Sequence, residues 1–329
     1  MAAVLAACGG PQGPSGSGSA LVRLDGSSTV FPISEAVAEE FRLATGTNVT
    51  VGISGTGGGF QKFCRGETDI SNASRPISEV EIEACRKSGI GFIELPMAYD
   101  GIAIVVNPKA SWIESITVAE LKRLWEPGAQ GTVRRWNQVR ASWPDREIHL
   151  FGAGVDSGTY DYFTQAITGK EGASRGDFTA SEDDNVLVQG IRNDELALGF
   201  LPFAYYHENR DSLKLIPVDD EQDLPVAGPV APNMDTIRSG DYQPLSRPVF
   251  IYVSEPALAR PEVQAFMDFY VANAGELAAE VGYVDLGTEG YRLVGEHLAS
   301  RRLGSAFEHG GSQVGLTLEQ LLSRERLPQ

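Results

Sequence analysis

Short apolar runs alternate with segments of helical periodicity along the first third of the chain. Ile33, Val37 and Phe41 recur at the spacing that places side chains on one helix face. The apolar runs are short enough for buried strands and lie near residues 21–24, 49–53, 92–95 and 102–106. This alternation predicts an α/β fold with a largely parallel sheet.

A second set of the same kind follows. Thr117 and Glu120 have the spacing of a capping box, so a helix is expected from there through Trp125. Pro261 is expected to begin a long amphipathic helix. Further strands are expected near residues 148–151, 198–201, 213–218 and 249–253. A chain of 329 residues is long enough for two such lobes, each with its own core.

The composition narrows the classes of partner. The chain has 27 Lys and Arg against 44 Asp and Glu, a formal net charge of −17. Proteins that bind nucleic acid carry basic patches, so we expect no nucleic-acid partner. After residue 8, no apolar run approaches the roughly 18 residues that would span a bilayer, so we expect no transmembrane segment.

The N-terminus has features of an anchor. Residues 1–8 are apolar and end in Leu5-Ala6-Ala7-Cys8, which resembles the bacterial lipoprotein signal, cleaved before a Cys that is then lipidated. Only seven residues precede Cys8, fewer than a complete export signal has. Residues 1–19 are therefore predicted to be a signal remnant and a flexible Gly- and Ser-rich tether. The alternative is an apolar N-terminus in which the Cys occurs by chance.

Cys64 and Cys85 are the remaining cysteines. In an exported protein they would most simply form a disulfide, and two unpaired buried thiols are the alternative. Closing a loop of about 20 residues would stabilise the fold by roughly 3 kcal/mol. Neither cysteine lies in a CxxC motif, so we expect no redox or metal chemistry there.

Three turns rich in Gly, Ser and Thr each separate a predicted strand from a predicted helix. They are Gly26-Ser27-Ser28-Thr29 before Pro32, Gly55 to Gly59 before Phe60, and Asp156-Ser157-Gly158-Thr159 before Tyr160. Helix N-termini carry unpaired amides and partial positive charge, so three converging turns can bind one oxyanion between the lobes. Arg75 follows a predicted strand and can add a bidentate fork; a solvated loop arginine is the alternative.

Other chemistries lack their motifs. The pattern GxxxxGK[ST] is absent, as is GxSxG, so no nucleotide P-loop and no common hydrolase elbow is predicted. His149, His207, His297 and His309 are far apart, so no metal motif exists. The adjacent Asp183 and Asp184 are interpreted as a solvated or hydrogen-bonded loop pair. We therefore expect no catalytic residues, no metal and no cofactor.

The chain resembles the PstS-type phosphate-binding proteins of ABC transporters. The similarity runs from about residue 20 to 305, and four segments carry it in the family's order: Asp25 to Pro32, Gly55 to Phe60, Asp69 to Ile77 and Asp156 to Thr159. It implies a two-lobed periplasmic-binding-protein-like fold of type II with the ligand in the interlobe cleft. The first lobe would hold residues 20–102 and 247–329, and the second lobe residues 103–246.

The resemblance also implies the ligand set. Ser28, Thr29 and the amide of Val30 would bind phosphate from the first turn, Thr56 from the second, and Ser157, Gly158 and Thr159 from the third. Ser74 stands where one branch of the family has an aspartate that accepts the phosphate proton, and Ala153 stands where that branch has an arginine. Arg75 can replace that arginine, and Asp156 or a hydroxyl oxygen can replace the acceptor.

The implied function is extracytoplasmic, high-affinity binding of inorganic phosphate and delivery to an ABC permease, without chemistry. The protein would be a periplasmic or cell-surface monomer that meets the membrane only through a lipid anchor at Cys8. Binding of sulfate or of oxyanions in general is an alternative, as is a phosphate sensor or adhesin on the same scaffold. An enzyme on phosphate esters would need a metal cluster or an activated nucleophile, and the sequence offers neither.

Overall fold

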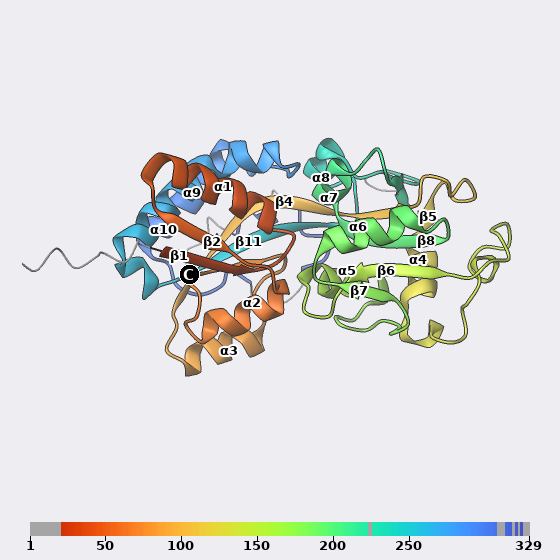
Figure 1. Ribbon diagram of the computed structural model, residues 1–329, viewed down its shortest axis with the longest axis horizontal. Coiled ribbons are helices and arrows are strands. Elements are labelled where there is room, and N and C mark those ends of the chain that lie inside the picture. Colours follow the sequence, from red (N-terminus) through yellow and green to blue (C-terminus); the bar gives the residue numbers. More distant parts are fainter. Residues whose placement is uncertain (1–20, 223–225, 308–312, 318–319, 322, 325–329) are drawn as a thin grey trace, which may run out of the picture.

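The computed structural model describes residues 21–222, 226–307, 313–317, 320–321 and 323–324. Two α/β lobes lie side by side along the longest axis (Figure 1). The first lobe contains β1 (Leu21–Gly26), α1 (Phe31–Thr45), β2 (Asn48–Val51), α2 (Gly55–Cys64), β3 (Ile70–Ala73), α3 (Glu79–Lys87), most of β4 (Phe92–Val106), β11 (Ser246–Ser254), α9 (Pro261–Glu280) and α10 (Gly287–Ser300).

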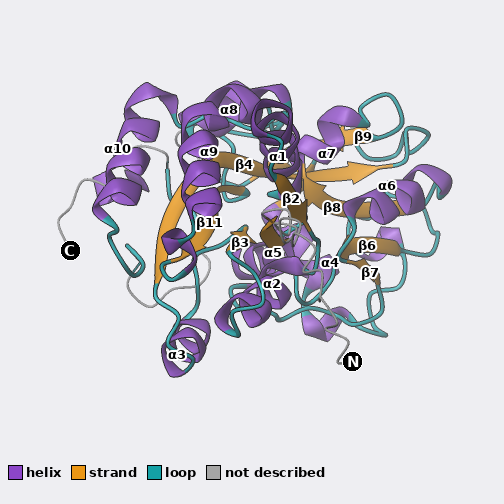
Figure 2. Ribbon diagram, turned by 60° about the vertical axis from the view of Figure 1, so that its left-hand side comes forward, coloured by secondary structure: helices purple, strands orange, loops and turns teal. Residues whose placement is uncertain are grey.

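The second lobe is formed by the chain between β4 and β11. It contains the end of β4, β5 (Ile116–Thr117), α4 (Val118–Trp125), β6 (His149–Ala153), α5 (Gly158–Thr168), β7 (Thr179–Ser181), α6 (Asp184–Asn193), β8 (Ala197–Pro202), α7 (Phe203–Glu208), β9 (Lys214–Ile216), β10 (Val218–Asp219) and α8 (Met234–Ser239). Figure 2 shows the strands running through the middle of the molecule with helices on the outside.

The sequence signals for individual helices are confirmed. Ile33, Val37 and Phe41 are buried on one face of α1. In the capping box of α4, the Glu120 amide donates to Thr117 Oγ1 at 3.1 Å, and the Thr117 amide donates to the Glu120 carboxylate at 3.0 Å. These local patterns form as predicted because the residues that cap or bury each helix are close together in the sequence.

The sheet is more mixed than predicted. Its strands follow the order β2-β1-β3-β11-β4-β8-β6-β7. The outer pairs are parallel, as expected, but β4 and β11 run antiparallel to each other and to their other neighbours. The chain therefore leaves the first lobe along β4 and returns to it at the start of β11, the antiparallel neighbour of β4.

Residues 92–95 and 102–106, expected as two strands, form the single strand β4 of 15 residues. Proline cannot donate a hydrogen bond to a strand ladder, and Pro96 lies within this strand. The structure accommodates Pro96 at an irregularity, where Phe250 of β11 pairs with Pro96 and Val249 with Ala98. Residues 92–101 of β4 pair with β11, and residues 102–106 pair with β8 and β9. The change of partners falls between Gly101 and Ile102, and the lobe boundaries given in the sequence analysis stay a prediction.

The disulfide is confirmed. Cys64, at the end of α2, is bonded to Cys85 of α3, with the two Cα atoms 4.2 Å apart. Cys8 and the tether lie outside the described residues. Within the described part of the chain, none of the helices has the length and apolar character needed to cross a membrane.

Candidate anion-binding site

Three helix N-termini meet between the lobes. The first turn (26–30) precedes α1, the second turn (54–56) begins α2, and the third turn (156–159) begins α5. Thr29 Oγ1 lies 2.9 Å from Thr159 Oγ1, although 130 positions separate the two residues in the chain. Thr56 Oγ1 lies 3.2 Å from Ser74 Oγ. The structure thus gathers hydroxyls from both lobes into one buried cluster.

The second turn differs from its prediction, because α2 begins at Gly55 and not at Phe60. The sequence predicts a glycine-rich turn from Gly55 to Gly59. Here the glycines permit close packing: Gly55 has a φ of +74°, and a Cβ on it would lie 2.3 Å from the carbonyl oxygen of Asp156. The second turn therefore packs directly against the backbone of the third.

The predicted residues Ser28, Thr29, Val30, Thr56, Ser74, Ser157, Gly158 and Thr159 are all buried in this region. The carbonyls of the first turn are occupied: Tyr205 donates to Ser28 at 3.1 Å and Tyr283 donates to Thr29. The Val30 amide donates to the Ser27 carbonyl at 3.2 Å. Among the described residues, no hydrogen bond is found from the Ser28, Thr29 or Gly158 amide. These amides remain available to an anion.

Gly158 lies at the centre of the contact between the lobes. A Cβ on it would lie 2.5 Å from Ser74 Oγ and 2.6 Å from Thr56 Oγ1. A residue other than glycine would have to displace these two hydroxyls. The absence of a side chain at Gly158 thus lets the third turn approach the second turn and the residue after β3.

Arg247, on β11, is the arginine of this cluster, and the sequence analysis missed it. It is fully buried, and its Nη2 donates to Thr159 Oγ1 at 2.8 Å and to Thr29 Oγ1 at 3.1 Å. Its Nη1 donates to the Gly158 carbonyl at 3.0 Å. Asp100 pairs with it across β4 and β11 at 3.2 Å. The available signal was a charged residue two positions before the apolar run 249–253.

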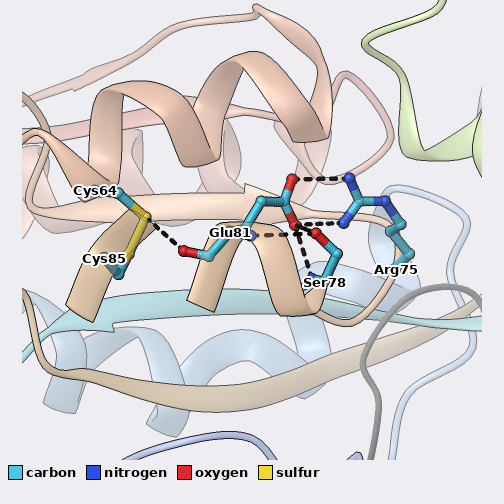
Figure 3. Close-up of a disulfide and its surroundings, with 5 residues drawn as sticks. All are labelled: Cys64, Arg75, Ser78, Glu81 and Cys85. Atoms are coloured by element: carbon cyan, nitrogen blue, oxygen red, sulfur yellow. Dashed lines mark hydrogen bonds and ion pairs between the residues drawn. A yellow bond between two sulfur atoms is a disulfide. The ribbon is translucent and has the colours of Figure 1, made fainter. Parts of the chain in front are cut away.

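Arg75 has other partners. Its Nη1 and Nη2 donate to the two carboxylate oxygens of Glu81 at 2.8 and 2.9 Å (Figure 3). Its Nε donates to Asp161 at 2.7 Å. The bidentate fork predicted for Arg75 exists, but a carboxylate of this chain occupies it. Arg247, and not Arg75, contacts the hydroxyls of the first and third turns.

A buried carboxylate faces the first turn from the second lobe. Asp184 is 1% exposed and accepts a hydrogen bond from the Ser28 hydroxyl, and its Oδ2 has no hydrogen-bond partner among the described residues. Burial raises the pKa of Asp184 to about 7; the Ser28 hydrogen bond and Arg247 lower it, and Asp100 raises it. Asp183 is exposed at the N-cap of α6, whereas Asp184 lies within α6, so Asp184 is hydrogen-bonded, as one alternative had it, but is not part of a solvated loop.

The other acids are placed differently. Burial raises the pKa of Asp100 to about 6, against the opposing charge of Arg247. Asp156, one of the phosphate-proton acceptors predicted from the sequence, is exposed. Its backbone carbonyl accepts a hydrogen bond from the Gly57 amide at 3.0 Å. No group of three or more His, Cys, Asp and Glu that could hold a metal ion occurs among the residues described.

Comparison with known proteins identifies the family. A model described as a PBP superfamily domain matches residues 13–274. Protein SphX of Synechococcus elongatus is 50% identical over 93% of this chain and 89% of its own length. The phosphate-binding protein PstS of Staphylococcus saprophyticus is 37% identical, with 88% of each chain covered. This chain belongs to the PstS family of phosphate-binding proteins.

Solved structures agree with the PstS assignment. A possible phosphate-binding protein from Planctomyces limnophilus is 43% identical, with a TM-score of 0.62 over 86% of this chain and 99% of that chain. An ABC-type phosphate transport receptor from Vibrio cholerae is 25% identical, with a TM-score of 0.58 over 80% of this chain and 99% of that chain. PstS-family members are solute-binding proteins with this two-lobed fold.

Proposed function

We propose that this protein captures inorganic phosphate between its two lobes, outside the cytoplasm, and delivers it to the permease subunits of an ABC transporter. The observation that carries the proposal is the position of Arg247, whose guanidinium contacts hydroxyls from two different lobes. An anion bound there would be contacted by one fixed positive charge and three helix N-termini. The names of the PstS relatives and of the Vibrio cholerae receptor support the same ligand and transporter.

The proposed ligand set keeps the sequence-based residues except Val30 and replaces the arginine. The hydroxyls come from Ser28, Thr29, Thr56, Ser74, Ser157 and Thr159, the guanidinium comes from Arg247, and the amides come from Ser28, Thr29 and Gly158, since the Val30 amide already donates to Ser27. Each hydrogen bond to a charged ligand contributes roughly 1.5 to 3 kcal/mol, which offsets the desolvation of the anion. Binding involves no bond making or breaking, so we expect no enzymatic activity.

We propose that Asp184 shares the phosphate proton. Its partnerless Oδ2 can accept a hydrogen bond from a protonated phosphate oxygen. Sulfate carries no proton near neutral pH, so it cannot donate a hydrogen bond to the ionised Asp184. The two negative charges would then repel each other without compensation. Selectivity for phosphate would then depend on a carboxylate of the second lobe, since Ser74 in the first lobe offers only a hydroxyl.

Three further features belong to this proposal: a lipid anchor at Cys8, a location in the periplasm or on the cell surface, and a monomeric state. Globomycin-sensitive processing and palmitate labelling that are abolished by Cys8→Ser would support the anchor. Unchanged release into the medium in that variant would count against it. Light scattering of the purified protein measures the oligomeric state.

The function itself is tested by calorimetric titration of the anion-stripped protein with phosphate. Micromolar or tighter binding is expected, with little or no heat from sulfate at pH 8. Equal binding of both anions would instead favour a general oxyanion receptor.

A further inference from the structure

The ion pairs of Arg75 connect the two lobes. Arg75 follows β3 in the first lobe, and Asp161 belongs to α5 in the second lobe, two residues after Thr159. Arg75 Nε lies 2.7 Å from Asp161 Oδ2. The side chains of Arg75 and Asp161 are only 7% and 18% exposed, so water screens this pair much less than it screens a surface pair.

The remaining nitrogens of Arg75 bind within the first lobe. Glu81 of α3 accepts from Nη1 and Nη2 at 2.8 and 2.9 Å. If the lobes separated, Arg75 would keep this bidentate partner while Asp161 became hydrated. Opening would therefore break one ion pair without leaving a buried charge unpaired, which is what a reversible contact requires.

Glu81 is held in place by its own helix. Glu81 and Ser78 form a capping box at the start of α3: the Glu81 carboxylate accepts from the Ser78 amide and hydroxyl, both at 2.8 Å. The disulfide then fixes α3 to α2, and Cys64 Sγ lies 3.5 Å from the Glu81 carbonyl oxygen (Figure 3). The disulfide thus ties the helix that orients Arg75 to the helix whose N-terminus carries Thr56.

We propose that Arg75 is a positioning residue that locks the lobes closed through Asp161, oriented by Glu81 and the Cys64–Cys85 disulfide. The proposal rests on the proposed function only in using phosphate as the ligand whose release is measured. The lock acts in the closed state, so its loss increases the rate of phosphate dissociation and leaves the association rate nearly unchanged.

The test compares Asp161→Asn, Arg75→Met and the double variant, with Arg86→Gln as a matched control. Arg86 lies on α3, is 73% exposed and pairs only with the neighbouring Glu83 in the described structure. Stopped-flow measurement should show phosphate dissociation about tenfold faster in both single variants. The double variant should be no worse than the single variants, since all three remove the same pair. Arg86→Gln should match the wild type.

A ligand role for Arg75 makes the opposite prediction. Asp161→Asn would then free Nε of Arg75 for the anion, so phosphate would bind as tightly as before or more tightly, while Arg75→Met would lose far more affinity. That result would overturn the proposal. Asp161→Asn leaves the Arg75–Glu81 pair and the helix cap intact, so it decides the question even if Arg75→Met folds poorly.

A second readout separates this proposal from the proposed function. Spin labels on exposed positions of the two lobes report the closed fraction without any phosphate. Asp161→Asn should lower that fraction, and so should Cys64→Ser/Cys85→Ser by a smaller amount. If the wild type bound no phosphate, the proposed function would fail while this shift still tested the lock. Identical distance distributions in wild type and Asp161→Asn would contradict the lock.

Discussion

Two buried arginines, Arg75 and Arg247, illustrate how the same side chain takes two roles. All three guanidinium nitrogens of Arg75 donate to the carboxylates of Glu81 and Asp161. Arg247 has one carboxylate partner, Asp100, and its remaining bonds go to hydroxyl and carbonyl oxygens. One carboxylate therefore balances the charge of Arg247, whereas two carboxylates surround Arg75. An anion is therefore attracted to the surroundings of Arg247 and repelled by the two acids around Arg75.

The largest expected effect is at Arg247. Replacing it in Arg247→Gln/Asp100→Asn removes the charge without leaving Asp100 buried and unpaired. Phosphate affinity should fall at least about a hundredfold, because a charged hydrogen bond is lost in a desolvated site. Calorimetry measures the affinity, and thermal unfolding shows that the variant is folded. A folded double variant that binds phosphate like the wild type would contradict the ligand role assigned to Arg247 and not to Arg75.

Asp184 should control selectivity. In Asp184→Asn, the amide can donate to sulfate, so the ratio of phosphate to sulfate affinity should fall about tenfold or more at pH 8. Asp183→Asn is the matched control, because Asp183 is adjacent but exposed. If Asp183→Asn relaxed selectivity as much as Asp184→Asn, the buried carboxylate would not be the discriminating group.

The same residue gives a pH dependence. Burial raises the pKa of Asp184 to about 7 in the closed structure, so the carboxyl is ionised above that pH and protonated below it. A protonated Asp184 donates to sulfate, so sulfate binding by the wild type should strengthen as the pH falls from 8 to 6. Neighbouring charges that act on this group are Arg247, Asp100 and Asp183. Sulfate titrations at several pH values should show the trend in wild type and its absence in Asp184→Asn.

Gly158→Ala tests whether the three turns close as tightly as the structure places them. Its methyl group would lie 2.5 Å from Ser74 Oγ, so the lobes cannot approach fully, and phosphate affinity should fall about tenfold. Gly128→Ala is the control, since a Cβ there meets nothing within 4 Å. Equal affinities in the two variants would mean that the bound state is more open than this structure.

The smallest effect is expected for Arg75→Lys. Lysine keeps the positive charge near Asp161 but cannot form the bidentate contact with Glu81. Phosphate affinity should fall by only about threefold, as expected for a contact that supports closure without touching the ligand. If phosphate affinity fell as much as it does on replacing Arg247, Arg75 would have to be a ligand of the anion.

Local patterns could be predicted from the sequence. The capping box at Thr117, the buried face of α1 and the Cys64–Cys85 disulfide all depend on residues close in the chain or on a simple pairing. The three Ser-, Thr- and Gly-rich turns were also recognised, because each adjoins a helix start. Their meeting between the lobes followed from the family resemblance and not from any local pattern.

The missed residues depend on tertiary packing. Asp183 and Asp184 are adjacent acids with opposite exposure, and only the tertiary position of the start of α6, which places Asp184 beside Ser28, distinguishes them. Arg75 was a candidate anion ligand because a fork that fits phosphate also fits a carboxylate. Its actual partner, Asp161, is 86 positions away in the sequence. No residue close to Arg75 in the sequence indicates that Asp161 is its partner.

The most direct test of the central claim is a phosphate titration of the anion-stripped wild type alongside Arg247→Gln/Asp100→Asn. The account predicts micromolar or tighter binding by the wild type and a loss of at least about a hundredfold in the folded double variant. Equal phosphate affinity in both proteins would contradict it, since the anion would then lie somewhere other than at Arg247.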